Sequence, residues 1–411
     1  MERADRTSWL AFGLTVLCAL VVAAPAAWGQ TIRASTEPEG TIRVLVPGRF
    51  ETTFTRRKGF GATLHDLKHD RQKRQDLAPV AEENGLLWTK TRGGSLTGDG
   101  SWYANPPEKI ELLESGPARV RVRVSGWHRK YGRTRPGDVW KELGFEQTFT
   151  MYASGHVYVD YALVAEKPVA NVHHFLLIIK STGAWGKQGK GAAKRQAHCA
   201  GLHGPKRPAP WSKTLTPFAL QWSDGPTCFL DILMVMYKGL YSGSYWDEGY
   251  REKDYRAGLR LAGRWKDKTI PAGRSHIHLL MRFGDDMNSP AAAKPYADDY
   301  RTPDKPTVLA GKLDVSDDGD RDGDGFNEAE GCYVLTAAKK PVALLLHGAK
   351  TPRMQPAFKT KSWPGAAPST LSLNGKSLLA GRDFNASVRE GTLLVQIMKA
   401  VKTDAKILIG G

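Results

Sequence analysis

The sequence predicts an all-β protein built from a large antiparallel β-sandwich and a smaller C-terminal β-sandwich. Short alternating or apolar runs recur between Gly, Pro and Asp turns, which is typical of sandwiches and barrels. Sustained helical periodicity is rare along the chain. The composition shifts toward Asp, Ala and Pro after Gly284, and a second series of strands follows Gly311.

The predicted strands fall into two groups. The large sandwich, residues 30–285, contains strands predicted at residues 41–47, 145–152, 156–164, 174–179, 255–261 and 276–283. A linker at residues 286–311 leads into the C-terminal sandwich, residues 312–411, with strands predicted at residues 333–335, 342–347, 370–373, 393–398 and 405–409. Each run alternates or is apolar, as half-buried or fully buried strands require.

The N-terminus predicts export. Arg3 and Arg6 precede an apolar run at residues 9–24, and Ala27-Trp28-Gly29 offers a cleavage site, so residues 1–29 have the layout of a signal peptide. No later apolar run is long enough to span a bilayer, which predicts a periplasmic or extracellular protein without a transmembrane segment in its mature chain. The sequence does not indicate the oligomeric state.

The charge of the chain indicates its partner. The 411 residues carry a formal net charge of +17, and so large an excess favours polyanions through steering and counterion release. Because the protein is predicted to be exported, we expect acidic polysaccharide and not nucleic acid. Removal of the signal leaves Cys199, Cys228 and Cys332, which permit at most one internal disulfide.

A basic strand is the first candidate for a ligand-binding surface. In RVRVRVSGWHRKYGRTR, residues 119–135, arginines and valines alternate, so Arg121 and Arg123 share one face while the valines can enter a core. Trp127 adds a ring that could stack on a sugar. The alternative is a solvated face whose arginines pair with carboxylates on neighbouring strands.

The loop after this strand holds the candidate catalytic residues. His128 is the usual proton carrier near neutral pH, and the cations around Tyr131 would stabilise its ionised form. Arg133 could neutralise an acidic substrate, and His174 is a reserve candidate for proton transfer. His276 and His278 share a strand face with Arg282, but without a third ligand this pair is a weak metal site.

Aromatic residues at 245–255 form a second candidate glycan surface. Tyr245 and Trp246 could stack on sugar rings, while Asp247 and Glu248 could serve a glycoside hydrolase. Adjacent carboxylates seldom flank one scissile bond, so we favour a polar, aromatic rim loop over a catalytic role for this segment. The chain contains no P-loop, Rossmann fingerprint, HExxH or GxSxG motif, which removes those enzyme classes.

An Asp-rich loop predicts a calcium site. In DRDGDGFNEAEG, the first half follows an EF-hand loop, because alternate aspartates and a turn glycine present several hard oxygen ligands. The twelfth position of the loop is Gly331 in place of the usual Glu, so Glu328 or Glu330 must complete the coordination shell of the cation. We expect a structural Ca²⁺; the alternative is a solvated acidic linker. The predicted ligands are Asp320, Asp322, Asp324, the Phe326 carbonyl, Glu328 and Glu330.

Several segments resemble a known family. KGFGATLHDLKHD, LLESGPARVRVRVSGWHR and FEQTFTMYASGHVYVDYAL resemble, in order, the supersandwich domains of the galactose-mutarotase-like superfamily. The stretches ESGPARVRVRVSG and YASGHVYVDY are most similar to the central β-sandwich of exo-acting rhamnogalacturonan-lyase-like proteins, and the resemblance as a whole covers roughly residues 58–180. The resemblance implies a β-supersandwich and a carbohydrate substrate. No family catalytic motif matches residue by residue, so no catalytic residue is carried over.

These observations lead to one functional hypothesis and two alternatives. A polysaccharide lyase that cleaves uronate-containing glycans by β-elimination needs a cation, a base and an acid, and the basic strand and its loop could supply them. A non-catalytic glycan-binding or cell-envelope protein would use the same surface without cleavage. A glycoside hydrolase would use carboxylates instead.

Overall fold

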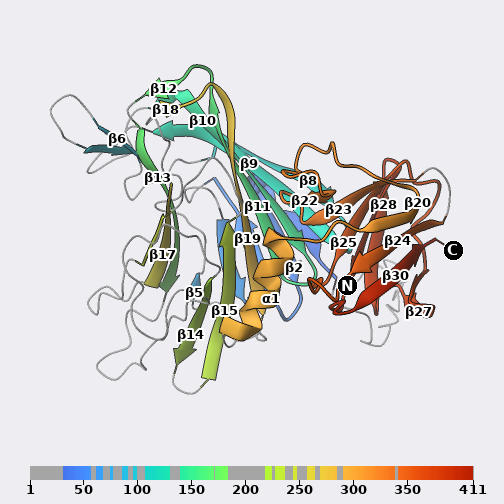
Figure 1. Cartoon of the computed structure of the whole chain (residues 1–411). Coiled ribbons are helices and arrows are strands. Elements are labelled where there is room, and N and C mark those ends of the chain that lie inside the picture. Colours follow the sequence, from blue (N-terminus) through green and yellow to red (C-terminus); the bar gives the residue numbers. More distant parts are fainter. Residues whose placement is uncertain are drawn as a thin grey trace, which may run out of the picture.

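The computed structural model describes residues 31–56, 62–67, 75–76, 86–90, 96–99, 107–129, 139–170, 172–183, 218–224, 227–236, 244–247, 257–263, 269–284, 290–337 and 341–410. Strands dominate this part of the chain, which confirms the all-β prediction (Figure 1). It also contains the helix α1 (Pro290–Arg301) and a 3-10 turn, η1 (Pro38–Gly40). No helix among the described residues is long and apolar enough to cross a membrane.

A seven-stranded antiparallel sheet is the centre of the large sandwich. Its strands, in sheet order, are β14 (Phe218–Asp224), β15 (Thr227–Met236), β19 (Gly273–Gly284), β11 (His156–Ala165), β10 (Val139–Tyr152), β9 (Arg119–Arg129) and β8 (Lys109–Ser115). β9, β10 and β11 are long, consecutive strands joined antiparallel. This order brings β19 beside β11, although more than a hundred residues separate them along the chain.

Smaller sheets complete the large sandwich. A four-stranded sheet runs β1 (Arg33–Thr36), β2 (Ile42–Val46), β3 (Phe50–Phe54) and β4 (Ala62–Asp66). A further sheet runs β16 (Ser244–Asp247), β17 (Ala257–Gly263), β13 (Val172–Gly183), β6 (Leu86–Lys90) and β7 (Leu96–Asp99), with β5 (Gln75–Asp76) also on β13. β12 (Val169–Ala170) pairs with β18 (Thr269–Ile270).

The alternation of β9 and β10 decides which face of the large sheet is buried in this sandwich. Val120, Val122 and Val124 are fully buried, as their spacing predicts. On β10, Phe149 belongs to the same face and packs edge-on against Phe54 of β3, with ring centroids 5.0 Å apart. The four-stranded sheet therefore packs against part of the valine face, and the arginine face points the other way.

The C-terminal unit is a second sandwich of two sheets. One runs β20 (Thr307–Ala310), β24 (Val342–His347), β30 (Asp404–Ile409), β26 (Thr370–Leu373) and β27 (Lys376–Leu379). The other runs β21 (Lys312–Leu313), β23 (Cys332–Thr336), β25 (Ala357–Lys361), β29 (Thr392–Ile397) and β28 (Phe384–Arg389), with β22 (Phe326–Asn327) paired to β23. All five C-terminal strands predicted from the sequence are present.

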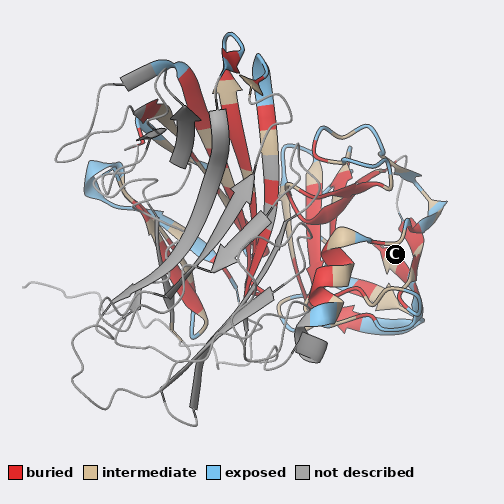
Figure 2. Cartoon of the chain, turned by 60° about the vertical axis from the view of Figure 1, so that its left-hand side comes forward, coloured by how far each residue is buried: buried red, intermediate tan, exposed pale blue. Residues whose placement is uncertain are grey.

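The two sandwiches share one hydrophobic cluster. Tyr152 and Tyr158, on the arginine face of the large sheet, join Tyr300 of α1 and the core of the C-terminal sandwich. The segment predicted as a linker thus contains α1, which lies against the large sheet (Figure 1). Buried residues continue along the large-sheet strands and through the C-terminal sandwich (Figure 2). Gly331 meets Tyr158 so closely that a Cβ there would overlap the ring.

Candidate functional site

A cleft of about 620 Å³ lies between the arginine face of the large sheet and the C-terminal sandwich. The large sheet contributes Arg121, Asp160, Arg274 and His276. The opposite wall is formed by Asp317, Asp318, Gly319, Arg321, Asn327, Ala329, Glu330 and Lys359. Because ligand sites commonly occupy clefts where two domains meet, this cleft is our candidate functional site.

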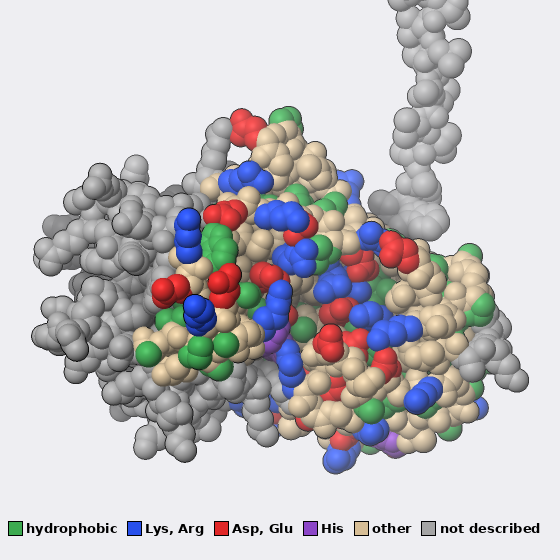
Figure 3. Space-filling model, turned by 90° about the horizontal axis from the view of Figure 1, so that it is seen from above, with side chains coloured by type: hydrophobic (Ala, Val, Ile, Leu, Met, Phe, Trp, Pro, Cys, Tyr) green, Lys and Arg blue, Asp and Glu red, His purple; other side chains and the backbone are tan. Residues whose placement is uncertain are grey.

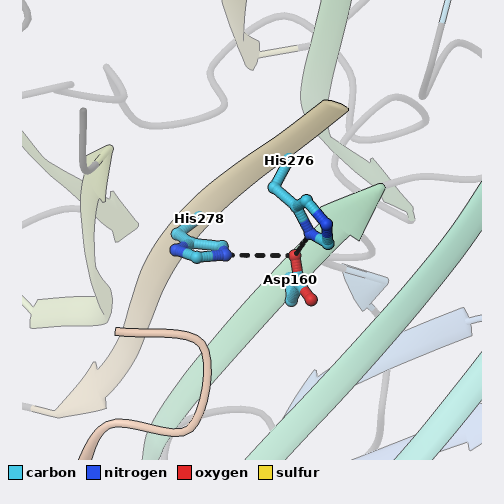
Figure 4. A group of neighbouring side chains, drawn as sticks. All are labelled: Asp160, His276 and His278. Atoms are coloured by element: carbon cyan, nitrogen blue, oxygen red, sulfur yellow. Dashed lines mark hydrogen bonds and ion pairs between the residues drawn. The ribbon is translucent and has the colours of Figure 1, made fainter. Parts of the chain in front are cut away.

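Three titratable side chains converge on the sheet side of the cleft (Figure 4). Asp160 of β11 lies directly opposite His278 of β19, and His276 is two residues away on the same face. Nδ1 of His276 lies 2.9 Å from Oδ1 of Asp160, and Nε2 of His278 lies 3.2 Å from the same oxygen. His278 is 3% exposed, whereas 26% of the His276 side chain is accessible, so His276 is the histidine that a ligand can reach.

The ionisation of Asp160 fixes the hydrogen bonding of His276. Burial alone would raise the pKa of Asp160, but hydrogen bonds from His276 and His278 outweigh it and hold the pKa well below its usual range. An ionised carboxylate only accepts hydrogen bonds, so Nδ1 of His276 must donate. Nε2 of a neutral His276 then keeps its lone pair. This arrangement makes His276 suited to accept a proton.

His278 has a different role because it is buried. Burial lowers the pKa of His278, and the opposing effect of Asp160 does not restore it, so the ring is neutral near pH 7. Its Nε2 also lies 3.3 Å from Nη2 of Arg321. One nitrogen of a neutral ring serves one of these partners at a time: it donates to Asp160 or accepts from Arg321.

The same three residues have donor atoms within 4.8 Å of one another, a spacing that a metal ion could also use. Asp160 supplies the third ligand that His276 and His278 lack in the sequence. However, the guanidinium of Arg321 lies against Nε2 of His278, and its positive charge opposes a cation there. We therefore interpret the group as a proton-transfer site.

Charges of both signs line the cleft. Glu330, 6% exposed, accepts ion pairs from Arg121 at 3.3 Å and Lys359 at 3.0 Å, and Arg274 forms a two-pronged pair with Glu146. Among the described residues that line the cleft, four are cationic and four are acidic. The cations are Arg121, Arg274, Arg321 and Lys359, and the carboxylates are Asp160, Asp317, Asp318 and Glu330. Seen from above, basic and acidic side chains are interspersed over the described surface (Figure 3). The charged residues that line the cleft offer many hydrogen-bonding groups to a ligand.

Of the three residues on β9 that were predicted to bind substrate, the structure places only Arg121 among the described lining residues of the cleft. Arg121 lines the cleft, as a ligand contact requires. Arg123 instead pairs with Glu111 of β8, its Nη2 lying 2.8 Å from the carboxylate. Trp127 is half-buried and is not among the lining residues of the cleft. The alternative interpretation, paired arginines on a sheet face, therefore describes Arg123.

His128 does not fit the catalytic role predicted for it. β9 continues without a break to Arg129, so His128 belongs to the valine face and is completely buried. Its ring packs against Phe145, and its Nε2 lies 3.4 Å from the Tyr161 hydroxyl. Burial lowers its pKa to about 3. A neutral histidine in the core cannot reach a polysaccharide, so we withdraw the assignment.

The remaining predictions on this site lie partly or wholly outside the described residues. Tyr131 and Arg133 are outside them. His174 lies in β13, and Tyr245 and Trp246 lie in β16, but the description of these three covers only the backbone. Their proposed roles remain predictions.

The Asp-rich loop forms the group expected for a cation. Carboxylate oxygens of Asp320, Asp322, Asp324 and Glu328 lie within 4.8 Å of one another. Burial is the main reason that the pKa of Asp324 rises to about 7 and that of Glu328 to about 8, and the crowded carboxylates add to it. Glu330 was predicted as a ligand but lies elsewhere: its carboxylate is 2.8 Å from Arg119 and also binds Arg121 and Lys359. Of the two glutamates, Glu328 joins the group.

Sequence reasoning missed Asp160 and the wall residues Arg321 and Lys359. Asp160 carried one signal: it is an acidic residue in the otherwise apolar strand HVYVDYALVA, where an unpaired carboxylate would be costly. Its partners come from a strand far along the chain, so the sequence does not name them. Arg321 and Lys359 reach the cleft only through the packing of the two sandwiches.

Comparisons with known proteins give structural matches alone. No protein-family model and no curated protein sequence matches the chain. Among solved structures, the chain is similar to a GalM/aldose epimerase homologue from C. elegans (10% identity, 62% of this chain and 99% of that one, TM-score 0.27). It is also similar to a galactose mutarotase related enzyme from Lactobacillus acidophilus (7% identity, 60% and 98%, TM-score 0.26).

A third match is the heparan sulfate lyase HepC from Pedobacter heparinus, at 9% identity and a TM-score of 0.31. It covers 62% of this chain and 36% of the lyase, so the chain spans about a third of that protein. The matched structures thus include mutarotase-related enzymes and a heparan sulfate lyase. At these scores they identify neither the substrate nor the reaction, which must be argued from the residues of this chain.

Proposed function

We propose that the protein is exported and acts on acidic polysaccharide in the cleft between the two sandwiches, cleaving uronate-containing glycans by β-elimination. The observation that carries this proposal is the pairing of an accessible His276 with Asp160 inside a charged cleft. A base held in one tautomer by a carboxylate is typical equipment for proton abstraction. The net charge of +17 supports an anionic substrate.

The residues of the cleft suit distinct steps of this reaction. His276 accepts the proton beside the uronate carboxylate through Nε2, and Asp160 stabilises the imidazolium that forms. Arg121 and Lys359 both line the cleft and form ion pairs with Glu330. Each can also stabilise the negative charge of a substrate carboxylate. The electron pair of the broken C–H bond forms the new double bond, and the glycosidic oxygen leaves with a proton. Tyr131, which the sequence offers as base or acid, is our candidate for the donor of that proton, in its protonated form.

The proposed reaction is tested by incubating the purified protein with uronate polymers and a neutral polymer in the presence of Ca²⁺. β-Elimination creates an unsaturated uronate, so we expect ultraviolet absorbance to grow together with new reducing ends on uronate polymers alone. New reducing ends without absorbance would identify a hydrolase and contradict the proposal. Binding without either signal would identify a glycan-binding protein and contradict it equally.

A further inference from the structure

The Asp-rich loop is at once a cation site and a wall of the cleft, and this double position is the basis of our inference. The loop residues Asp317, Asp318, Gly319 and Arg321 line the cleft, while carboxylate oxygens of Asp320, Asp322 and Asp324 lie within 4.8 Å of one another. We propose that Ca²⁺ bound by Asp320, Asp322, Asp324 and Glu328 prepares the cleft for an anionic ligand. The calcium site stands by itself; its effect on the ligand rests on the proposed function.

Glu328 is the residue that points to a bound cation. Its side chain is completely buried, and one carboxylate oxygen, Oε2, accepts a hydrogen bond of 3.0 Å from the backbone N–H of Arg321. The other oxygen, Oε1, is buried without a hydrogen-bond partner among the described residues. A buried carboxylate oxygen without a partner is costly, and a cation shared with three neighbouring carboxylates would satisfy it.

The chemistry of the donors selects Ca²⁺ over softer metals. All four side chains offer carboxylate oxygens, the ligands of hard cations, and no sulfur or imidazole belongs to the group. Gly325 has φ +85 and occupies position six of the loop, where an EF-hand turns sharply. A Cβ at Gly325 would overlap the side chain of Leu313, so the turn is also sterically fixed.

Two contacts connect this site to the proton-transfer group. Glu328 holds the backbone of Arg321, and the guanidinium of Arg321 lies 3.3 Å from Nε2 of His278. His278 in turn shares Asp160 with His276. A cation that fixes Glu328 and the loop therefore also fixes the position of Arg321 in the cleft.

Charge provides the second connection. Residues 314–330 contain eight acidic side chains and one basic side chain, Arg321. Without a cation, this wall repels an anionic glycan at short range, and the described residues that line the cleft carry no surplus of positive charge to compensate. A bound Ca²⁺ brings two positive charges to the wall and offsets part of its negative charge. Calcium should therefore strengthen binding of acidic glycans at this cleft.

The calcium site is tested by titrating the apo-protein with Ca²⁺ in a calorimeter. We expect Glu328→Gln to abolish one calcium-binding event that the wild type shows, with a Kd of at most about 1 mM, the range of extracellular EF-hand modules. Glu390→Gln, the same substitution at an exposed position of the C-terminal sandwich, should leave that event unchanged. If Glu328→Gln does not fold, Asp322→Asn at the exposed edge of the group replaces it. Calcium binding that is absent, or unaffected by both loop substitutions, would overturn the proposal.

The effect on the cleft is tested with short uronate oligosaccharides, which limit direct cross-linking by Ca²⁺. We expect chelation to weaken oligosaccharide binding by the wild type about tenfold or more, equivalent to about 1.4 kcal/mol, and to leave the weak binding of Glu328→Gln unchanged. Equal affinity with and without Ca²⁺ would overturn the coupling. A protein that binds Ca²⁺ but no uronate in either condition would contradict the proposed function and leave the calcium site standing.

Discussion

Replacing His276 by alanine is expected to lower the rate of uronate cleavage by about 10²–10⁴-fold, the usual contribution of a positioned general base. The substitution removes the accessible imidazole of the cleft and leaves Asp160 paired with His278 alone. Because His276 is only partly buried, the fold should survive. The measurement is kcat on a uronate polymer in the presence of Ca²⁺, with circular dichroism to verify the folded state.

The matched control is His347→Ala. His347 also lies near a carboxylate, with Nδ1 3.8 Å from Asp404, but it belongs to β24 of the C-terminal sandwich and not to the cleft. Its replacement should leave kcat within about twofold, the scale of effects expected of surface substitutions. If His276→Ala cleaves as fast as His347→Ala, His276 is not the base.

Replacing Glu330 by glutamine is expected to lower the free energy of unfolding by about 3 kcal/mol, the low end of the range for breaking a buried ion pair. Glu330 connects Arg119 and Arg121 of the large sheet to Lys359 of the C-terminal sandwich. Without the carboxylate, the buried guanidinium of Arg119 keeps only Glu114 as an acidic partner among the described residues. Urea denaturation measures the loss.

An exposed ion pair gives the control for this prediction. Glu390→Gln removes a carboxylate that is 82% exposed and pairs with Arg389, so the expected loss is below about 1 kcal/mol. Similar losses in the two variants would show that the Glu330 cluster does not hold the sandwiches together. A greater loss at Glu330 supports its role in shaping the cleft.

The strands could be predicted because their signals are local. The valines of β9 alternate with arginines and are fully buried, and β24 and β26 begin and end where the apolar runs do. The helix α1 was missed because its sequence, PAAAKPYADDYR, contains an internal proline and few apolar residues. Its buried tyrosines have partners only in the assembled protein.

The cleft could not be predicted because it depends on contacts between distant segments. Arg121 and Arg123 are equivalent in the alternation of β9, yet packing of the C-terminal sandwich puts Arg121 in the cleft and leaves Arg123 beside Glu111. Asp160 and His276 meet because β11 and β19 are neighbours in the sheet. No spacing in the sequence reveals that pairing.

His128 was misplaced for a reason that the sequence contains. From the sequence, a loop is expected after the alternating residues, but β9 runs on through Gly126 to Arg129. A Cβ at position 126 would lie 3.1 Å from the Phe145 ring, so glycine serves close packing at this point in the strand and does not end it. With the strand unbroken, alternation alone puts His128 on the valine face.

The central claim, that an acidic glycan binds between the two sandwiches, is tested most directly by a crystal structure of His276→Ala with a short uronate oligosaccharide and Ca²⁺. We expect the sugar to lie in the cleft with a carboxylate near Arg121 and Lys359 and with the proton beside that carboxylate directed at the position vacated by the His276 ring. An oligosaccharide bound on any other surface, with the cleft empty, would contradict the account.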